Sequence, residues 1–195
     1  MRYILASASP RRKEILESVG LNFDIVVADA DETSDICDPV LLTRALAELK
    51  GRAVMEKLTA DRSLGDDTVI ISADTVVVCD GEILGKPKNR ADAERMLRML
   101  SGRSHEVVSG VALTYRGVTY TDASVTRVTF DAIDEDFLSR YLDSDEPYDK
   151  AGAYAVQGVA ATFVNKIEGC YFGVVGLSVN CLINLARKNN IPFDI

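Results

Sequence analysis

The feature that most constrains the fold is a run of apolar, β-forming residues at 69–79, interrupted by the carboxylate of Asp74. Such a run is typical of a strand buried inside a sheet. A buried carboxylate is costly unless it is neutral, paired with a cation or bound to a metal. Two interpretations follow. Asp74 lies at a strand end and caps a neighbouring turn, or it is a catalytic base or metal ligand held on a rigid strand.

Strand and helix patterns alternate early in the chain, and strand patterns cluster later. Asp80-Gly81 predicts a hairpin turn after the buried strand, and Arg116-Gly117 predicts a turn within a long antiparallel pair. The mix predicts an α/β protein with a mixed, bent β-sheet flanked by helices, in two lobes around a cleft. The expected strands cover 3–6, 23–27, 69–79, 82–84, 106–115, 118–130 and 161–167, and the expected helices begin near 10, 39, 90, 135 and 177.

Charge and composition exclude several classes of protein. The chain has 195 residues, which suits one domain spanning 1–195, and a net charge of −8. This charge argues against nucleic-acid and membrane partners, so a polyanionic ligand needs a local basic pocket or a divalent metal. No apolar run is long enough for a signal peptide or a membrane span. With four scattered cysteines and His105 as the only histidine, we expect no zinc site, and reduced thiols in a cytoplasmic protein.

The segment 7–13, Ser-Ala-Ser-Pro-Arg-Arg-Lys, follows an apolar run and opens an amphipathic stretch. It predicts a strand, a tight loop and a helix, with Ser9 as the capping residue and Pro10 at the first helical position. Cations in a first helical turn oppose the helix dipole unless an anion binds there. Serine hydroxyls, free N–H groups, Arg11 and Arg12 would make a phosphate site. The alternative is a solvated basic face.

Three further residues are candidates for the same chemistry. Lys86 lies on a glycine-flanked turn across the predicted hairpin from Asp74, although Pro87 excludes a P-loop. Glu32 lies in an acidic loop and, with Asp74, has the oxygen ligands that a hard divalent cation prefers. Gln157 offers a donor and an acceptor that suit a base edge, or a structural hydrogen bond. No segment of the sequence resembles the Gly-x-Ser-x-Gly nucleophile turn of serine hydrolases, so a Ser-His-Asp site at His105 is not expected.

Five motifs in order closely resemble the Maf-like nucleoside triphosphate pyrophosphatases, and the match covers nearly the whole chain. They are Ser-Ala-Ser-Pro-Arg-Arg at 7–12, Ser-Ala-Asp-Thr-Val-Val at 72–77, Leu-Gly-Lys-Pro at 84–87, Leu-Ser-Gly-Arg-Ser-His at 100–105 and Asp-Lys-Ala-Gly-Ala-Tyr at 149–154. The resemblance implies a fold related to inosine-triphosphate pyrophosphatases. It also implies hydrolysis of a nucleoside triphosphate to the monophosphate and pyrophosphate with a divalent metal, Mg²⁺ or Mn²⁺, and a homodimer.

The resemblance also assigns roles. Asp74 matches the catalytic proton acceptor, and the positions tied to substrate choice are Arg12, Thr75 and Gln157. Further polar positions of the cleft are Ser7, Glu32, Lys50 and Lys86. The 149–154 stretch with Gln157 is similar to the branch that acts on dTTP and UTP. The sister branch, which prefers 7-methyl-GTP, and a nucleotide-binding regulator of cell division are the alternatives.

These assignments lead to a chemical hypothesis. The phosphate-binding set would be Ser7, Ser9, Arg11, Arg12, Lys50 and Lys86, and the metal-binding set Glu32 and Asp74. Asp74 would either deprotonate the attacking water or hold the metal. Gln157 would pair with the imide edge of uracil or thymine, which cytosine lacks.

The chain departs from the family pattern at two places. Gly51 follows Lys50 where alanine is usual, which implies a helix cost of ~1 kcal/mol. The sequence Gly-Leu-Ser-Val at 176–179 replaces the usual Gly-Leu-Pro-Leu. This second change alters the start of the last helix, far in sequence from the predicted chemistry, and neither change argues against the activity.

Overall fold

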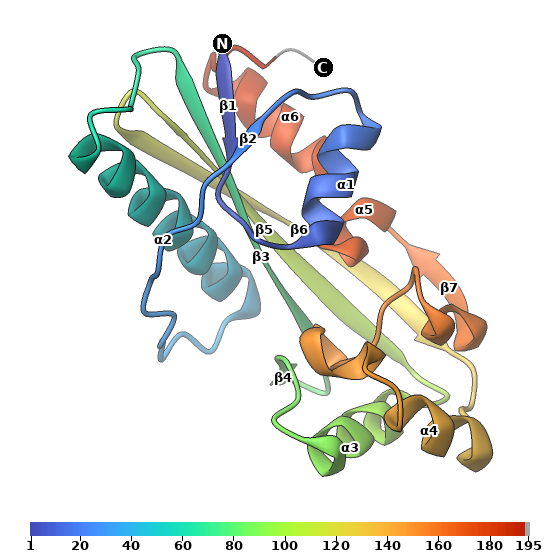
Figure 1. Cartoon of the computed structure of the whole chain (residues 1–195). Helices are drawn as coiled ribbons and strands as arrows, with labels where there is room; N and C mark the ends of the chain where they lie inside the picture. The colour runs from blue at the N-terminus through green and yellow to red at the C-terminus, as the bar shows by residue number, and fades with distance from the viewer. Residues whose placement is uncertain (194–195) are drawn as a thin grey trace.

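A computed structural model describes residues 1–193 and shows a mixed α/β fold built on a seven-stranded sheet (Figure 1). The strand order is β2-β1-β3-β5-β6-β7, and β4 pairs with the far end of β3. The pairs β1–β2 and β1–β3 are parallel, and the others are antiparallel. This confirms the prediction of a mixed sheet. The strands are β1 (Arg2–Leu5), β2 (Asp24–Ile25), β3 (Thr68–Cys79), β4 (Glu82–Leu84), β5 (Ser104–Tyr115), β6 (Val118–Phe130) and β7 (Val164–Glu168).

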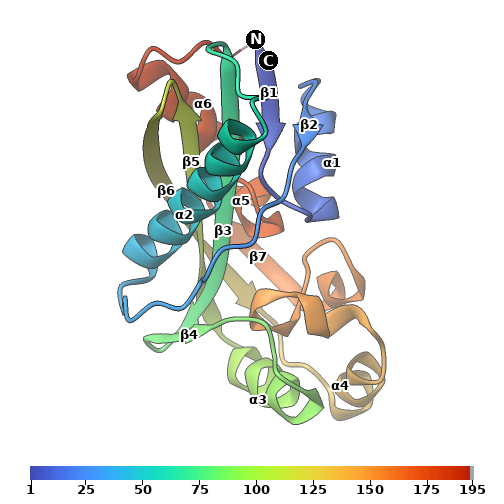
Figure 2. The ribbon, with the colours of Figure 1, turned by 60° about the vertical axis from the view of Figure 1, so that its left-hand side comes forward.

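Helices cover both faces of the sheet, with α2 on one face and α1 and α6 on the other (Figure 2). The alternation of β3 explains this division, because successive side chains point to opposite faces. Ile70 packs in a small cluster with Val54 and Leu58 of α2, whereas Val69 and Ile71 belong to the main core. The helices are α1 (Pro10–Ser18), α2 (Pro39–Ala60), α3 (Arg90–Leu100), α4 (Glu135–Leu142), α5 (Tyr171–Val175) and α6 (Val179–Lys188), with 3₁₀ turns η1 (Glu146–Asp149), η2 (Ala151–Ala153) and η3 (Val159–Phe163).

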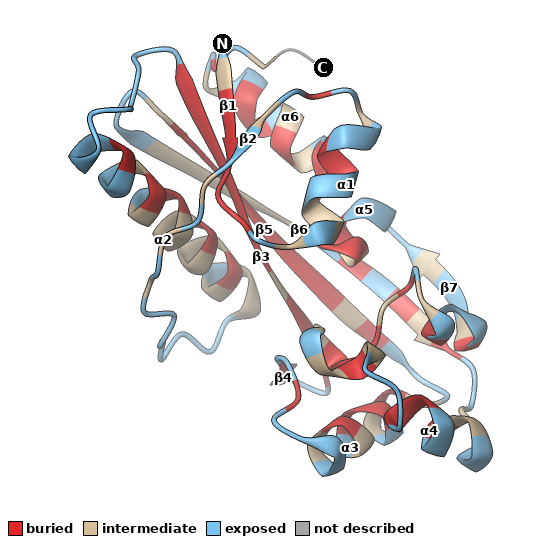
Figure 3. Cartoon of the chain, viewed as in Figure 1, coloured by how far each residue is buried: buried red, intermediate tan, exposed pale blue. Residues whose placement is uncertain are grey.

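The long strands β3, β5 and β6 connect two groups of elements at opposite ends of the molecule (Figure 1). One group holds β1, α1, α2 and α6, and the other holds β4, α3, α4 and the 3₁₀ turns. Buried residues follow β3 and β5 and the inner faces of the helices (Figure 3). Ala93, Met96, Leu97 and Leu100 form the buried face of α3, as the apolar spacing predicts.

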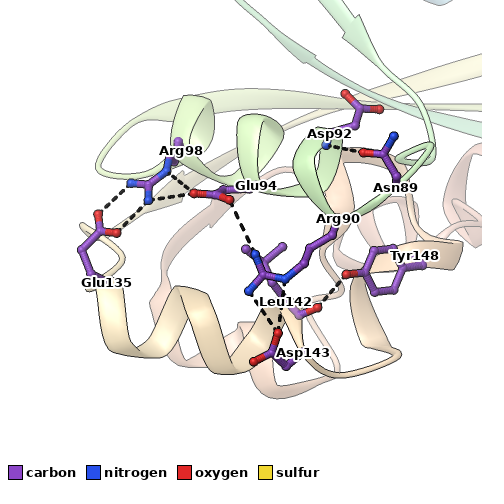
Figure 4. Close-up of polar contacts among 9 residues, drawn as sticks. All are labelled: Asn89, Arg90, Asp92, Glu94, Arg98, Glu135, Leu142, Asp143 and Tyr148. Atoms are coloured by element: carbon purple, nitrogen blue, oxygen red, sulfur yellow. Dashed lines mark hydrogen bonds and ion pairs between the residues drawn. The ribbon is translucent and has the colours of Figure 1, made fainter.

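Exposed ion pairs join α3 to α4 on the outside of the second group (Figure 4). Arg98 reaches Glu135 through both terminal nitrogens, at 2.7 Å each. Arg90 bonds Asp143, and the Tyr148 hydroxyl donates to the carbonyl of Leu142 at 2.6 Å. Such exposed pairs contribute little to stability. They lie away from the cavity described below.

Several expected elements differ from the structure at their ends by one to three residues, and three of these differences have a clear physical cause. The strand expected at 23–27 is only β2, Asp24–Ile25, because it pairs on one side alone and both residues are exposed. The strand expected from 161 starts at Val164, because the preceding residues form η3. The last helix begins at Val179 because Ser178 caps it, and α5 precedes it. No helix within residues 1–193 is long and apolar enough to cross a membrane.

Candidate functional site

A cavity of about 700 Å³ lies between the two groups of elements. Its walls come from the β1–α1 junction, the loop at 27–32, the middle of α2, the middle of β3, the turn after β4, the 149–157 segment and the 174–176 segment. The structure brings every candidate site residue to this one cavity. They are Ser7, Ser9, Arg11, Arg12, Glu32, Lys50, Asp74, Thr75, Lys86 and Gln157.

Asp74 lies within β3, opposite Gly110 of β5, and not at a strand end. Strand β1 pairs with β3 only as far as Ile71, so the edge of β3 at Asp74 is open to the cavity. Asp74 is 8% exposed, and its Oδ1 accepts a hydrogen bond from Lys50 Nζ at 2.7 Å. The carboxylate is therefore paired with a cation and does not cap a turn. The geometry matches the second interpretation of the sequence, a carboxylate held on a rigid strand.

Close packing of α2 on the sheet brings Lys50 to Asp74. Ser72 Oγ donates to the carbonyl of Ala47 at 2.6 Å, which fixes the middle of α2 against β3. A Cβ at Gly110 would lie 2.4 Å from the carbonyl of Thr43, so α2 approaches β5 only because this residue is glycine. Gly51 allows the same approach, since a Cβ there would lie 2.8 Å from Ser72 Oγ. Glycine at 51 lowers the intrinsic stability of the helix, but the missing side chain also lets α2 pack closely against the sheet.

Lys50 also contacts a second carboxylate. Its Nζ lies 2.9 Å from Glu32 Oε2, so one ammonium stands between Glu32 and Asp74. The Glu32 side chain is half exposed, whereas those of Lys50 and Asp74 are mostly buried. Within residues 1–193, no three His, Cys, Asp or Glu residues gather as a metal site. Two carboxylates nevertheless suit a hard divalent cation, which commonly takes its remaining ligands from water and substrate phosphates.

The β1–α1 junction forms a cationic cradle in the same cavity. Ser7 Oγ accepts from the backbone N–H of Ser9 and from a terminal nitrogen of Arg12, both at 3.2 Å. Ser9 occupies the N-cap position of α1, as predicted, but its side chain makes no capping hydrogen bond to a described residue. Pro10 stands at the helix start. The first turn of α1 therefore keeps N–H groups for an anion.

Arg12 is held in a fixed orientation. Its Nε donates to the carbonyl of Gly176 at 2.9 Å. Burial lowers the pKa of the Arg12 guanidinium, the neighbouring Arg11 acts in the same direction, and the charges of Asp74 and Glu32 oppose both. Arginine stays charged despite such a shift. Arg12 is thus a poorly hydrated cation, for which an anionic ligand would replace the missing water.

Sequence reasoning missed the contribution of the segment at 176–179. Thr75 Oγ1 and Arg12 Nε both donate to the Gly176 carbonyl, at 3.3 and 2.9 Å. This segment is far from Asp74 in sequence, but Gly176 lines the cavity. Gly176 has a φ of 138°, a conformation that favours glycine. The glycine itself was the only signal in the sequence for the role of this position. Ser178 caps α6 by accepting from the N–H of Cys181.

The remaining wall comes from the 149–157 segment. Arg11 donates to Asp149 Oδ2 at 3.1 Å, which joins α1 to η1 across 138 residues of sequence. Lys150, which the sequence analysis did not select, also lines the cavity and bonds Asp149. Lys86 and Gln157 are exposed side chains that line the cavity. Its cationic groups therefore come from both ends of the molecule.

His105 is not among the residues that line this cavity and is 3% exposed. Its Nε2 is 2.6 Å from the Tyr154 hydroxyl, and burial lowers the pKa of the imidazole to about 4. The edges of Phe130 and Tyr154 pack against the ring. The histidine is a neutral residue of the core.

Comparison with known proteins matches this chain to a family and to curated relatives. A family model described as "Maf-like protein" matches residues 2–189. A dTTP/UTP pyrophosphatase of Alkaliphilus metalliredigens is 48% identical over 191 residues, covering 96% of each chain. A protein of the same name from Bacillus anthracis is 41% identical and covers 97% of this chain and 96% of its own. Among solved structures, the Staphylococcus aureus Ham1 protein has a TM-score of 0.47 at 15% identity, over 67% of this chain and 72% of that one.

Proposed function

We propose that this chain, which belongs to the Maf-like protein family, hydrolyses dTTP and UTP to the nucleoside monophosphate and pyrophosphate. The names of its relatives, at 41–48% identity over nearly the whole chain, support this substrate class. One observation carries the proposal. A mostly buried carboxylate, Asp74, faces the same cavity as the Ser7–Arg12 cradle.

The triphosphate binds where the cations are. A nucleoside triphosphate carries roughly four negative charges, which the protein must neutralise before water can attack. The compensating positive charge comes from four side chains that line the cavity, Arg11, Arg12, Lys50 and Lys86. The first-turn N–H groups of α1 add to it. The net charge of −8 makes this local concentration of cations necessary.

Glu32 and Asp74 are the residues that would hold a divalent cation, Mg²⁺ or Mn²⁺. When bound, such an ion supplies charge neutralisation to the phosphate oxygens and to the departing pyrophosphate. Lys50, between the two carboxylates, neutralises part of their charge in the free protein.

Asp74 is the residue that takes the proton from the attacking water. Lys50 engages Oδ1, and no described residue donates a hydrogen bond to Oδ2. Oδ2 is thus available to a water molecule, whose oxygen forms a bond to the α-phosphorus while the bond to the pyrophosphate oxygen breaks. The rigidity of β3 holds the carboxylate in position for this transfer.

Gln157 reads the base, with Arg12 and Thr75 as the further residues tied to substrate choice. The Gln157 amide has one acceptor and two donors, which complement the N–H and flanking carbonyls of uracil or thymine. Cytosine lacks that N–H, so its triphosphate is discriminated against. A cytoplasmic homodimer is part of the proposal. It rests on the family resemblance, and size-exclusion chromatography with light scattering tests the dimer.

A nucleotide panel with Mg²⁺ or Mn²⁺ tests the proposed function. The expected products from UTP and dTTP are the monophosphate and pyrophosphate, and CTP and 7-methyl-GTP should react more slowly. Asp74→Asn should lower kcat by roughly 10²-fold or more, since the amide cannot accept the proton. The conservative size of asparagine preserves the fold, which a melting curve checks. Orthophosphate as the only product, or full activity of Asp74→Asn, would contradict the proposal.

A further inference from the structure

The turn that carries Gln157 is pinned on both sides. The N–H of Gly158 donates to the carbonyl of Ala155 at 3.2 Å, which places Val156 and Gln157 at the corners of a turn. Val156 is buried in the main core, whereas Gln157 is exposed toward the cavity. The orientation of Gln157 therefore depends on what holds the chain just after it.

The carboxylate of Glu146 holds that chain. Its Oε2 accepts from the N–H of Val159 at 3.0 Å, and its Oε1 accepts from the N–H of Ala160 at 3.4 Å. These N–H groups open η3, directly after Gly158. The Tyr141 hydroxyl donates to Glu146 Oε1 at 3.3 Å, which steadies the carboxylate from α4. Glu146, which lies 11 positions before Gln157, thus caps the N-terminal end of η3.

Gly158 leaves the space that this carboxylate fills. A Cβ at Gly158 would lie 2.0 Å from Glu146 Oε1. The glycine has a φ of −103°, which any residue adopts, so the requirement for glycine comes from space and not from backbone conformation. A side chain at 158 would have to displace Glu146. Glu146 and Gly158 therefore form one contact that ends the Gln157 turn.

We propose that Glu146 is a specificity-positioning residue: it fixes the turn at 155–158 so that Gln157 meets the pyrimidine base in one orientation. This rests on the proposed base-reading role of Gln157. A preorganised amide loses less conformational entropy on binding than a mobile one, so loss of the cap weakens discrimination between bases. Within residues 1–193, the hydrogen-bond partners of the Glu146 carboxylate are Tyr141, Val159 and Ala160, and none of them belongs to the phosphate cradle or is Asp74. Glu146→Ala should accordingly leave the chemical step intact.

Kinetics with UTP and CTP test the proposal. In Glu146→Ala, the UTP-to-CTP ratio of kcat/KM should fall about 5-fold or more, mainly through the KM for UTP, with kcat within about 2-fold of wild type. Glu146→Gln keeps one oxygen acceptor and should give an intermediate ratio. Glu135→Ala is the matched control, because it removes another carboxylate from the same end of the molecule. Among the described residues, its side chain bonds Arg98 alone, on the outside (Figure 4). It should keep the wild-type ratio.

A double-mutant cycle identifies the contact itself. Gly158→Ala should lower the ratio in the wild-type background, because the new Cβ displaces the Glu146 carboxylate. It should have little further effect in the Glu146→Ala background, since there is no carboxylate left to displace. Additive effects would show that Gly158 and Glu146 act separately and would overturn the proposal.

Amide hydrogen exchange over 155–161 separates the possible failures. Exchange at Val159 and Ala160 should accelerate in Glu146→Ala and not in Glu135→Ala. Faster exchange with an unchanged UTP-to-CTP ratio would leave Glu146 a purely structural cap and overturn the positioning role. A wild-type enzyme that does not discriminate UTP from CTP would instead contradict the proposed function of Gln157, whatever the exchange result.

Discussion

At the scale of the residue, the site depends on side chains whose neighbours leave them little freedom. Asp74 is paired with Lys50, and Arg12 is held between Ser7 and the carbonyl of Gly176. Moving either charged group away from its partners would cost free energy, because each group is partly or mostly withdrawn from water. In the proposed mechanism, these charges are therefore in position before substrate binds, which lowers the reorganisation needed during the reaction.

His105 gives a prediction about stability at acid pH. Burial lowers its folded-state pKa to about 4, below the ordinary value of about 6.5. Between these values the unfolded chain binds the proton and the folded chain does not, so acidification destabilises the fold. The contribution is fully present above pH 6.5 and is lost as the pH falls toward 4, by ~3 kcal/mol at most. Urea unfolding at pH 4.5 and 7.5 measures it.

The control for this prediction is His105→Gln, which keeps a polar group near the Tyr154 hydroxyl but does not titrate. The difference in unfolding free energy between the two pH values should be smaller in this variant than in the wild type. An equal pH dependence in the two proteins would show that His105 is not the titrating group.

At the scale of the element, α2 and the sheet form a fixed unit. The glycines at 51 and 110 let the helix approach β3 and β5 closely, and Ser72 bonds its backbone. Lys50 reaches Asp74 from this position. The geometry of the Lys50–Asp74 pair is thus a consequence of helix–sheet packing.

Gly110→Ala tests this dependence. The added Cβ would lie 2.4 Å from the backbone carbonyl of Thr43, so α2 must shift away from β5. We expect overpacking to cost about 1–3 kcal/mol of unfolding free energy. We also expect the displaced Lys50 to lower kcat by about 10²-fold.

Gly65→Ala is the matched control, because its Cβ would approach only the flexible Asp67 carboxylate, at 3.1 Å, and the Thr68 hydroxyl, at 3.5 Å. Its activity with UTP should be unchanged. A Gly110→Ala enzyme with wild-type kcat would show that the helix position does not control the site.

Local sequence patterns predicted most helices and strands. Where these predictions differ from the structure, contacts with other parts of the fold account for most of the differences. The apolar run around Asp74, the Asp80-Gly81 turn and the spacing of α3 are local signals, and the structure agrees with them. The start of α6 is set by the local cap from Ser178 to Cys181, whereas the short β2 and the role of Gly176 depend on partners distant in sequence. The cap from Glu146 to Val159 is of the same kind, since 13 residues separate its two ends.

At the scale of the whole molecule, the cavity joins two ends that the sequence separates. Arg12 comes from the β1–α1 junction, Asp74 from the central strand β3 and Gln157 from the turn between η2 and η3. The Arg11–Asp149 pair spans the two groups of elements. A triphosphate on the cradle and a base at Gln157 would occupy both ends of this cavity at once, with the α-phosphorus near Asp74.

Hydrolysis of UTP in ¹⁸O-labelled water tests most directly where the water attacks. If Asp74 directs water to the α-phosphorus, the label enters UMP and pyrophosphate stays unlabelled, as mass spectrometry of the two products would measure. Label in pyrophosphate would mean attack at the β-phosphorus and would contradict the proposed mechanism.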